Sequence, residues 1–427
     1  MAEDREEERG GVSDPPRLVT ADRAQLQLRP TDLESLIPAD HRARAIWMFV
    51  ERLELSRFYA GIQARGSEPG RPAIDPKLLL ALWVYATSEG VGSARELARL
   101  CEQHDAYRWL CGGVGMNHHT LSDFRVAHGA ALDELLTQVL GVMLHHGLVG
   151  LERVTQDGMR VRANAGAASF RREITLRRCV AAARAQVEAL KDAGERPADP
   201  RAARRAAAAA RVAREREKRV TRALAELPAA RAPKRGEAAK ANARVSLTDP
   251  EARVMKMADG GYRPAYNVQL ATAVEGRVIV GVQVTNAGTD HASLTPMRAE
   301  VERRTGQQPR EYLVDGGFVE LDNIAAAAAE GVTVYAPVKA SQRLDVDPHV
   351  PKPTDAPAVA AWRTRMGTAE AKEIYKDRAA VAETVNADLR THRGLDRFPV
   401  RGVGKVQCIV VWAALTYNVL RWLALSA

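Results

Sequence analysis

Apolar and polar residues alternate with a period of two between residues 262 and 288, a pattern typical of β-strands. Val268 and Leu270 alternate with polar neighbours, and valine then recurs at every second position from Val278 to Val284. The pair Glu275-Gly276 separates these runs, so the pattern predicts a β-hairpin.

Shorter apolar runs predict further strands on both sides of this hairpin. The run 151–158 precedes it, and the runs 312–314 and 332–337 follow it. Helical patterns at 291–304 and 321–331 lie between the later strands. Strands that alternate with helices predict an α/β fold with a mixed sheet.

The first part of the chain has helical patterns instead. Asp75 and Pro76 predict the start of a mostly apolar helix, and Ser93 with Glu96 forms a capping box for the next one. The glycine-containing turn between them is compatible with a helix-turn-helix that binds DNA, and equally with an ordinary all-α domain. Two further helices are expected, one within 31–59 and one over 121–147 that Thr120 and Asp123 would cap.

The composition changes between residues 170 and 244, where alanine and arginine dominate. This segment holds 21 Lys or Arg against 9 Asp or Glu, so its net charge of +12 exceeds the +9 of the whole chain. Apolar positions step by four and three residues, as in a heptad seam, at Leu176, Val180, Ala183, Val187 and Leu190. The sequence 193–200, AGERPADP, breaks the helical pattern, so we expect an inserted antiparallel helical hairpin. Its charge favours contact with DNA phosphates over a solvated arm without a partner.

These patterns divide the chain into four parts. We expect a disordered acidic tail at 1–24, an all-α domain at 25–149 and an α/β domain formed by 150–169 and 245–427. The segment 170–244 is the inserted hairpin with its linker.

Charge, cysteine content and hydropathy limit the kinds of partner and the cellular compartment that we expect for the protein. A pI near 9.5 suits a polyanionic partner such as nucleic acid. Four scattered cysteines do not make a disulfide framework, so a reducing compartment, the cytoplasm, is expected. The apolar segment 408–425 contains Asn418 and Arg421, which favours a buried helix over a membrane span.

Three acidic residues are candidates for chemistry. Asp157 and Asp315 are each followed by glycine after a predicted strand, so we expect both at strand ends, facing the crevice where α/β sheets bind ligands. Glu383 lies on a predicted helix from Ile374 to Arg390. Singly, each aspartate is typical of a turn and the glutamate of a solvated helix face. Together, three carboxylates can hold two divalent cations for phosphoryl transfer.

The same helix carries the residues of a known signature. Tyr375, Arg378, Glu383 and Arg390 resemble the Tyr, Arg, Glu and Lys of the C-terminal signature of DDE transposases of bacterial insertion sequences, with one residue more before the Glu and Arg in place of Lys. The sequences QDGMRVRANAG around Asp157 and VDGGF around Asp315 resemble the first two acidic motifs of that family. The block 93–125 resembles its N-terminal domain, which implies that residues 25–149 form an all-α DNA-binding domain.

This resemblance implies the fold, the site and the activity. The order of strands and helices is that of an RNase H-like mixed sheet flanked by helices, with the hairpin inserted after the first strand. Asp157, Asp315 and Glu383 would be catalytic and would hold two Mg²⁺ ions, for which Mn²⁺ would substitute. The residues implied in DNA binding are Tyr375, Arg378, Arg390, Arg162 and Lys405.

The implied function is DNA transposition, with strand cleavage at the element ends and strand transfer into target DNA. Implied partners are the terminal inverted repeats, target DNA and a second copy of the chain in a homodimer on DNA, and no membrane. Two alternatives stay open, an inactive DNA-binding derivative of a transposase and an RNase H-like nuclease. As isolated residues, Tyr375, Arg378 and Arg390 fit equally as partners of Asp377 and Glu383 within the helix.

Overall fold

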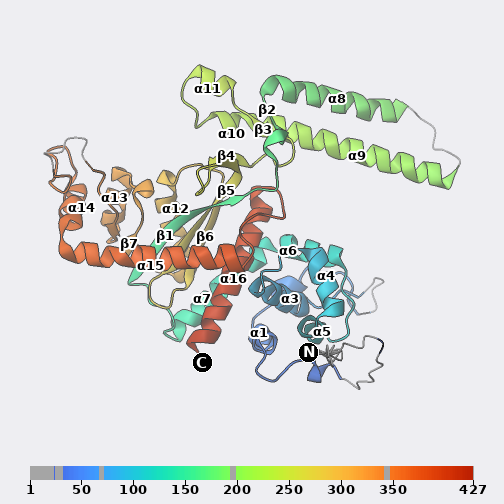
Figure 1. The fold of residues 1–427 in the computed structure, drawn as a ribbon, viewed down its shortest axis with the longest axis horizontal. Coiled ribbons are helices and arrows are strands. Elements are labelled where there is room, and N and C mark those ends of the chain that lie inside the picture. Colours follow the sequence, from blue (N-terminus) through green and yellow to red (C-terminus); the bar gives the residue numbers. More distant parts are fainter. Residues whose placement is uncertain (1–23, 25–31, 67–71, 193–198, 341–346, 427) are drawn as a thin grey trace, which may run out of the picture.

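The computed structural model describes residues 24, 32–66, 72–192, 199–340 and 347–426. The predicted acidic tail, apart from Ala24, and most of the predicted helix break at 193–200 lie outside these residues. Figure 1 shows a sheet flanked by helices, a group of helices formed by the N-terminal part of the chain, and a long helical hairpin that projects away from both.

The central sheet is mixed, with strand order β6-β5-β1-β7-β8. β5 pairs antiparallel with β1 and β6, whereas β7 and β8 run parallel to β1. A further short strand, β4, which the sequence pattern did not predict, pairs with the first residues of β5. The sheet and its helices confirm the predicted RNase H-like fold class. The strands are β1 (Arg153–Arg162), β4 (Arg253–Lys256), β5 (Tyr262–Ala273), β6 (Ile279–Thr285), β7 (Glu311–Leu313) and β8 (Thr333–Tyr335).

Helices cover both faces of this sheet. Gln156 donates to Ser293 just before α12, whereas its neighbour Asp157 is bonded to α15. Since successive residues of a strand point to opposite faces, α12 and α15 lie on opposite sides of β1. The helices after the hairpin are α12 (Leu294–Thr305), α13 (Leu321–Ala329), α14 (Pro357–Gly367), α15 (Ala369–His392) and α16 (Val403–Leu425).

The last helix, α16, joins the sheet to the N-terminal helices. Within the described residues it is the one helix long and apolar enough to cross a membrane, and 61% of its most apolar window is buried in the fold. Buried Asn418 accepts from the backbone N–H of Ile279 and donates to the backbone oxygen of Ile279. It therefore provides hydrogen-bond partners for the backbone of this residue at the edge of β6. The helix therefore packs as the predicted core helix.

Among the described residues, seven α-helices precede the sheet, and they share one apolar core with it. The predicted caps at Asp75 and Ser93 are confirmed, since their side chains accept from the backbone N–H groups of Lys77 and Glu96. The predicted cap at Thr120 and Asp123 is wrong, because Asn117 caps α6 and the expected long helix is divided at 128. The helices are α1 (Arg42–Glu51), α2 (Ser56–Tyr59), α3 (Pro76–Ser88), α4 (Ala94–Gln103), α5 (Asp105–Cys111), α6 (His118–Ala127) and α7 (Gly129–His145).

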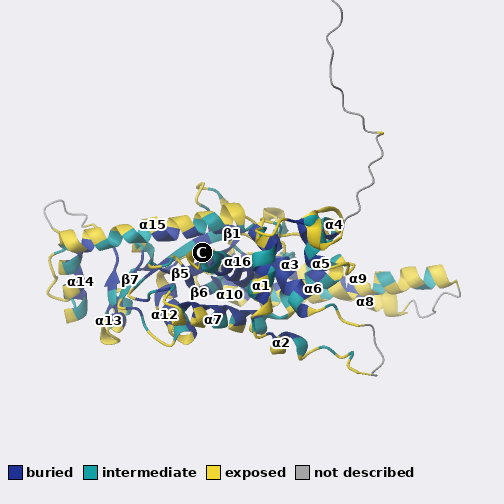
Figure 2. Ribbon diagram, turned by 90° about the horizontal axis from the view of Figure 1, so that it is seen from below, coloured by how far each residue is buried: buried dark blue, intermediate teal, exposed yellow. Residues whose placement is uncertain are grey.

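The predicted insertion forms a helical arm, which here means residues 170–246. Its long helices α8 (Glu173–Asp192) and α9 (Pro200–Ala225) pack together through the predicted seam, with Leu176, Val180, Ala183 and Val187 buried. Two short strands close its base, because Phe170 and Arg171 pair antiparallel with Ser246 and Val245. The arm is exposed along most of its length (Figure 2). Its remaining elements are β2 (Phe170–Arg171), α10 (Leu227–Arg231), α11 (Glu237–Ala241) and β3 (Val245–Ser246).

Candidate active site

The site lies where the long strand β1 extends past the end of its short neighbour β7. β7 pairs with residues Arg153 to Thr155 only, whereas β5 pairs with β1 as far as Arg162. Asp157 is therefore in the middle of β1, just past the end of β7, and the expectation that it ends its strand is wrong. The long antiparallel partner β5 keeps the strand extended after Asp157-Gly158. The edge of β1 that β7 leaves free then provides the crevice.

Asp315 reaches the same edge from the parallel strand β7. It follows that strand by two residues, and its Oδ1 accepts the backbone N–H of Gly317 at 2.7 Å as the cap of a short 3-10 helix. The parallel register pairs Thr155 with Leu313, and Asp157 and Asp315 each lie two residues past that pair, which brings the two acids close together.

Two side chains of α15 bind Asp157 directly. The Arg378 guanidinium lies 2.9 Å from Asp157 Oδ1 and 3.6 Å from Asp315 Oδ2, so it bridges the two acids. Asn386 donates to Asp157 Oδ2 at 2.9 Å, and the backbone N–H of Gly158 donates to Oδ1 at 2.9 Å. Asn386 was not predicted as a site residue, although it lies three residues after Glu383 and residues three apart are neighbours on a helix surface.

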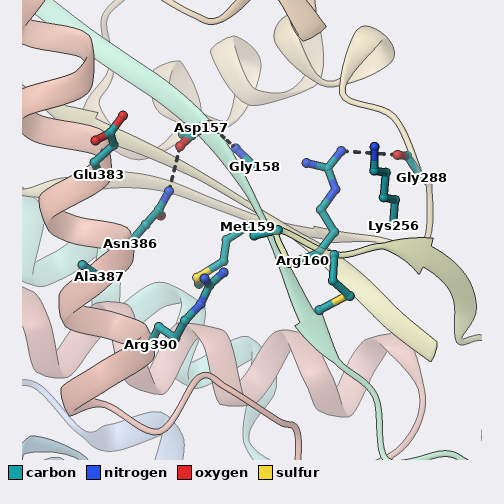
Figure 3. A pocket seen from close by; sticks show the side chains of 12 residues that line it. Asp157, Gly158, Met159, Arg160, Lys256, Gly288, Glu383, Asn386, Ala387 and Arg390 are labelled. Atoms are coloured by element: carbon teal, nitrogen blue, oxygen red, sulfur yellow. Dashed lines mark hydrogen bonds between the residues drawn. The ribbon is translucent and has the colours of Figure 1, made fainter. Parts of the chain in front are cut away.

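Glu383 shares a cavity of about 580 Å³ with Asp157. It is exposed and makes no hydrogen bond or ion pair with any described residue, although both acids lie at one end of the cavity (Figure 3). Three cations, Arg160, Lys256 and Arg390, line other parts of the wall (Figure 3). The full lining is Asp157, Gly158, Met159, Arg160, Lys256, Met257, Ala258, Gly288, Glu383, Asn386, Ala387 and Arg390.

The other residues with an implied DNA role have different positions. Tyr375 is partly buried and donates to the backbone oxygen of Val314 at 3.1 Å. This hydrogen bond connects α15 to the residue that follows β7. Arg162 pairs with Asp396 at 3.2 Å, and Lys405 is exposed on the first turn of α16. Neither of these two lines the cavity.

Burial and neighbouring charges act on Asp157 in opposite directions. Burial raises the pKa of this carboxyl above its usual range, and Arg378 partly offsets that effect. The negative charges of Asp315 and Asp290 raise the pKa further. The positive charge of Arg378 therefore favours the anionic form of Asp157.

Asp290 is a fourth acid at this edge, and sequence reasoning missed it. Its side chain is almost completely buried and accepts from Asn267 at 2.7 Å, Gln269 at 2.6 Å and Arg160 at 2.6 Å. A Cβ at Gly158 would lie 2.5 Å from Asp290 Oδ1, so the glycine after Asp157 makes room for this carboxylate. A usable sequence signal was the polar pair Asn267 and Gln269, which face inward on β5.

Replacing Asp290 with alanine should lower the free energy of unfolding by about 3–5 kcal/mol, because it removes the buried carboxylate that accepts from Arg160 and from two buried amides. Chemical unfolding of the full chain measures this loss. The control is Asp396→Ala, which breaks an exposed Arg–Asp pair and should cost less than about 1 kcal/mol. Equal losses in the two variants would contradict the structural role of Asp290.

The donor chemistry of the site suits divalent cations. Asp157, Asp315 and Glu383 supply carboxylate oxygens, the ligands that Mg²⁺ and Mn²⁺ prefer. Within the described part of the chain, however, no three acidic, histidine or cysteine side chains are grouped closely enough to hold an ion. Arg378 instead supplies the positive charge between the two aspartates. Asp157 and Glu383 line one cavity, whereas Asp315 does not line it and is linked to Asp157 through Arg378. The convergence of all three acids on two cations therefore stays a prediction.

Two family models match parts of this chain. Residues 31–127 match the transposase domain DUF772, and residues 230–419 match the transposase DDE domain. Together the matches cover roughly two thirds of the chain, including Asp315 and Glu383, while Asp157 lies between them. No curated protein and no solved structure matched.

A mixed sheet with acidic residues from β1, the end of β7 and α15 defines a protein of the RNase H-like class. With both family matches, the chain belongs to the DDE transposases of insertion sequences. Membership implies an enzyme that acts on DNA by cleavage and transfer, and the family generally uses a divalent metal ion.

Proposed function

We propose that this chain cuts DNA at the ends of its own element and joins the freed ends to target DNA, with Asp157, Asp315 and Glu383 as the catalytic acids. The observation that carries the proposal is the cavity that Asp157 and Glu383 share, with Asp315 held beside Asp157 by Arg378. The acids come from three elements far apart in sequence. Chance turn residues would not meet at one edge of the sheet.

Each acid has a distinct structural support. Asp157 is held by Asn386 and Gly158, which fix both of its oxygens, and Asp315 is fixed by its bond to Gly317. Glu383 has no described partner and is free to take a ligand from the cavity. When bound, two Mg²⁺ ions, or Mn²⁺ in their place, would supply the charge that activates the attacking oxygen and stabilises the leaving oxygen.

Arg378 has a different role from the one that the resemblance implies. Its side chain lies between the aspartates rather than on an open surface, so we assign it to neutralising their mutual repulsion. Tyr375 is assigned to positioning α15. We assign phosphate contact in the cavity to Arg390, Arg160 and Lys256, whose charges suit the DNA backbone. Arg162 and Lys405 stay candidates for contact with DNA outside the cavity.

The rest of the chain supplies binding rather than chemistry. We propose that the helices within 25–149 recognise the terminal inverted repeats and that the basic helical arm contacts phosphates without reading sequence. Cutting two element ends together requires a homodimer on DNA. The domain limits near 149 and at 170 and 244, and a cytoplasmic location, remain predictions.

Retention of all three acids favours an active enzyme over an inactive DNA-binding derivative. A nuclease of the same fold would cut DNA but would not join it. Incubating the full chain with Mg²⁺, a labelled DNA carrying the inverted repeats that flank its coding sequence and a plasmid target separates these functions. The proposal predicts cuts at the repeat ends and labelled joint products. Cleavage without joining would identify a nuclease, and binding without cleavage an inactive derivative.

A further inference from the structure

The hairpin of β4 and β5 has one face that lacks a partner in the described fold. Tyr262 is 69% exposed and Val254 is 49% exposed, although both are large apolar residues. Tyr262 is paired with Lys256 across the two strands, and directly paired residues project on the same face. Lys256, Tyr262 and Val254 therefore form one exposed stripe along the hairpin.

The exposure of Tyr262 does not come from a loose turn. Asp259 pairs with Arg263 at 2.6 Å and accepts the backbone N–H of Gly261 at 3.0 Å. The backbone N–H of Met257 donates to the oxygen of Gly261 at 2.8 Å, and Met255 on the opposite face is buried. The tyrosine ring itself makes no hydrogen bond or ring contact with a described residue. A well-held hairpin thus presents an aromatic ring to solvent.

This stripe continues into the wall of the cavity that contains the catalytic acids. Lys256, Met257 and Ala258 line that cavity together with Asp157 and Glu383. Because Lys256 and Tyr262 project on one face, the ring lies beside the wall, on the cavity side of the hairpin. A DNA strand whose phosphate reaches the acids would pass this ring.

We propose that the β4–β5 hairpin is a stacking platform for an unpaired base of the DNA strand that occupies the cavity. This rests on the proposed function and adds a ligand contact to it. A base within a duplex already has both faces stacked, so an exposed ring can stack only on a base at a strand end or one that has left the helix. Lys256 beside the ring matches the phosphate of the same nucleotide, as in sites that combine aromatic stacking with basic groups.

The test uses the full chain and a short duplex with an unpaired extension that carries 2-aminopurine, in EDTA so that no cleavage occurs. Stacking on Tyr262 should quench the fluorescence of this base. Tyr262→Ala should restore the fluorescence and weaken binding to the extended duplex by about 10- to 100-fold, with little change for a blunt duplex. Tyr262→Trp should keep both signals, since it keeps an aromatic face.

Val254→Ala is the matched control, since it removes apolar surface from the same stripe but no ring, and it should behave as wild type. Quenching and affinity that are unchanged in Tyr262→Ala would overturn the platform, even where the wild type cleaves and joins DNA. If Tyr262→Ala lost the same affinity for the extended duplex as for the blunt one, the platform would also be overturned. Such a result would show that Tyr262 contacts DNA without requiring an unpaired base. Failure of the wild type to cleave with Mg²⁺, with quenching intact, would reject the proposed function instead.

Discussion

Replacing Glu383 with glutamine is expected to lower metal-dependent strand cleavage by about 10²–10³-fold or more, the size typical when a group that stabilises transition-state charge is removed. The amide keeps the shape of the side chain but removes the charge that a cation needs. The affinity of the variant for terminal DNA should stay within about twofold of the wild-type affinity. A tenfold change would correspond to about 1.4 kcal/mol of binding free energy, so the expected change is much smaller than that. Cleavage and binding titrations on the same labelled DNA measure both effects.

Two other acids of α15 serve as controls. Glu370 lies in the first turn of the helix, and Glu373 is exposed and pairs with Lys376. Neither lines the cavity, so Glu370→Gln and Glu373→Gln should cleave normally. Asp388 is engaged elsewhere, since it pairs with Arg393 at 3.0 Å. Loss of cleavage in a control variant, with Glu383→Gln active, would assign the third acid to a different residue.

Removal of the helical arm should have the second large effect, on DNA affinity. Because Arg171 pairs with Val245, replacing residues 172–244 by Asn-Gly leaves a two-residue hairpin turn that closes β2 on β3. Affinity should fall for all DNA sequences alike, and the log–log salt slope should flatten by about 0.9 for each DNA phosphate that the arm neutralises. Binding titrations over a range of salt concentrations measure the slope.

A smaller change tests the same contacts without removing the arm. Arg204, Arg211 and Lys218 are exposed and repeat every seven residues on α9, turned away from Ala213 and Val220, which pack toward α8. Changing all three to glutamine should flatten the log–log salt slope of DNA binding, but by less than the deletion of residues 172–244 does. An unchanged salt slope in both variants would show that the arm does not touch DNA.

The sequence alone was sufficient to predict the strands and helices that have a local pattern of apolar and polar residues. The alternation around Val268 and Val278 predicted β5 and β6, and the helix predicted from Ile374 to Arg390 forms most of α15. The predicted heptad positions of the arm from Leu176 to Val187 are buried, whereas the last one, Leu190, is exposed. Each of these signals depends on the period of a strand or helix, which neighbouring residues determine.

Contacts between distant segments were not predictable in the same way. Asp157 stays within its strand because β5 pairs with β1 beyond it, and a local Asp-Gly signal does not reveal that partner. Asp290 lies more than a hundred residues from Asp157 and beside no recognisable motif. Arg378 lies between the two aspartates and pairs with both, whereas the family resemblance implied that it contacts DNA.

The central claim is that Asp157 belongs to a metal-dependent cleavage site, and exchange of its oxygen for sulfur tests this most directly. A thiolate binds Mg²⁺ poorly and softer ions such as Mn²⁺ better. The account predicts that Asp157→Cys does not cleave DNA with Mg²⁺ and regains cleavage with Mn²⁺, whereas Asp157→Ala is inactive with both. Cleavage by Asp157→Ala with Mg²⁺ at the rate of the wild type would contradict the account.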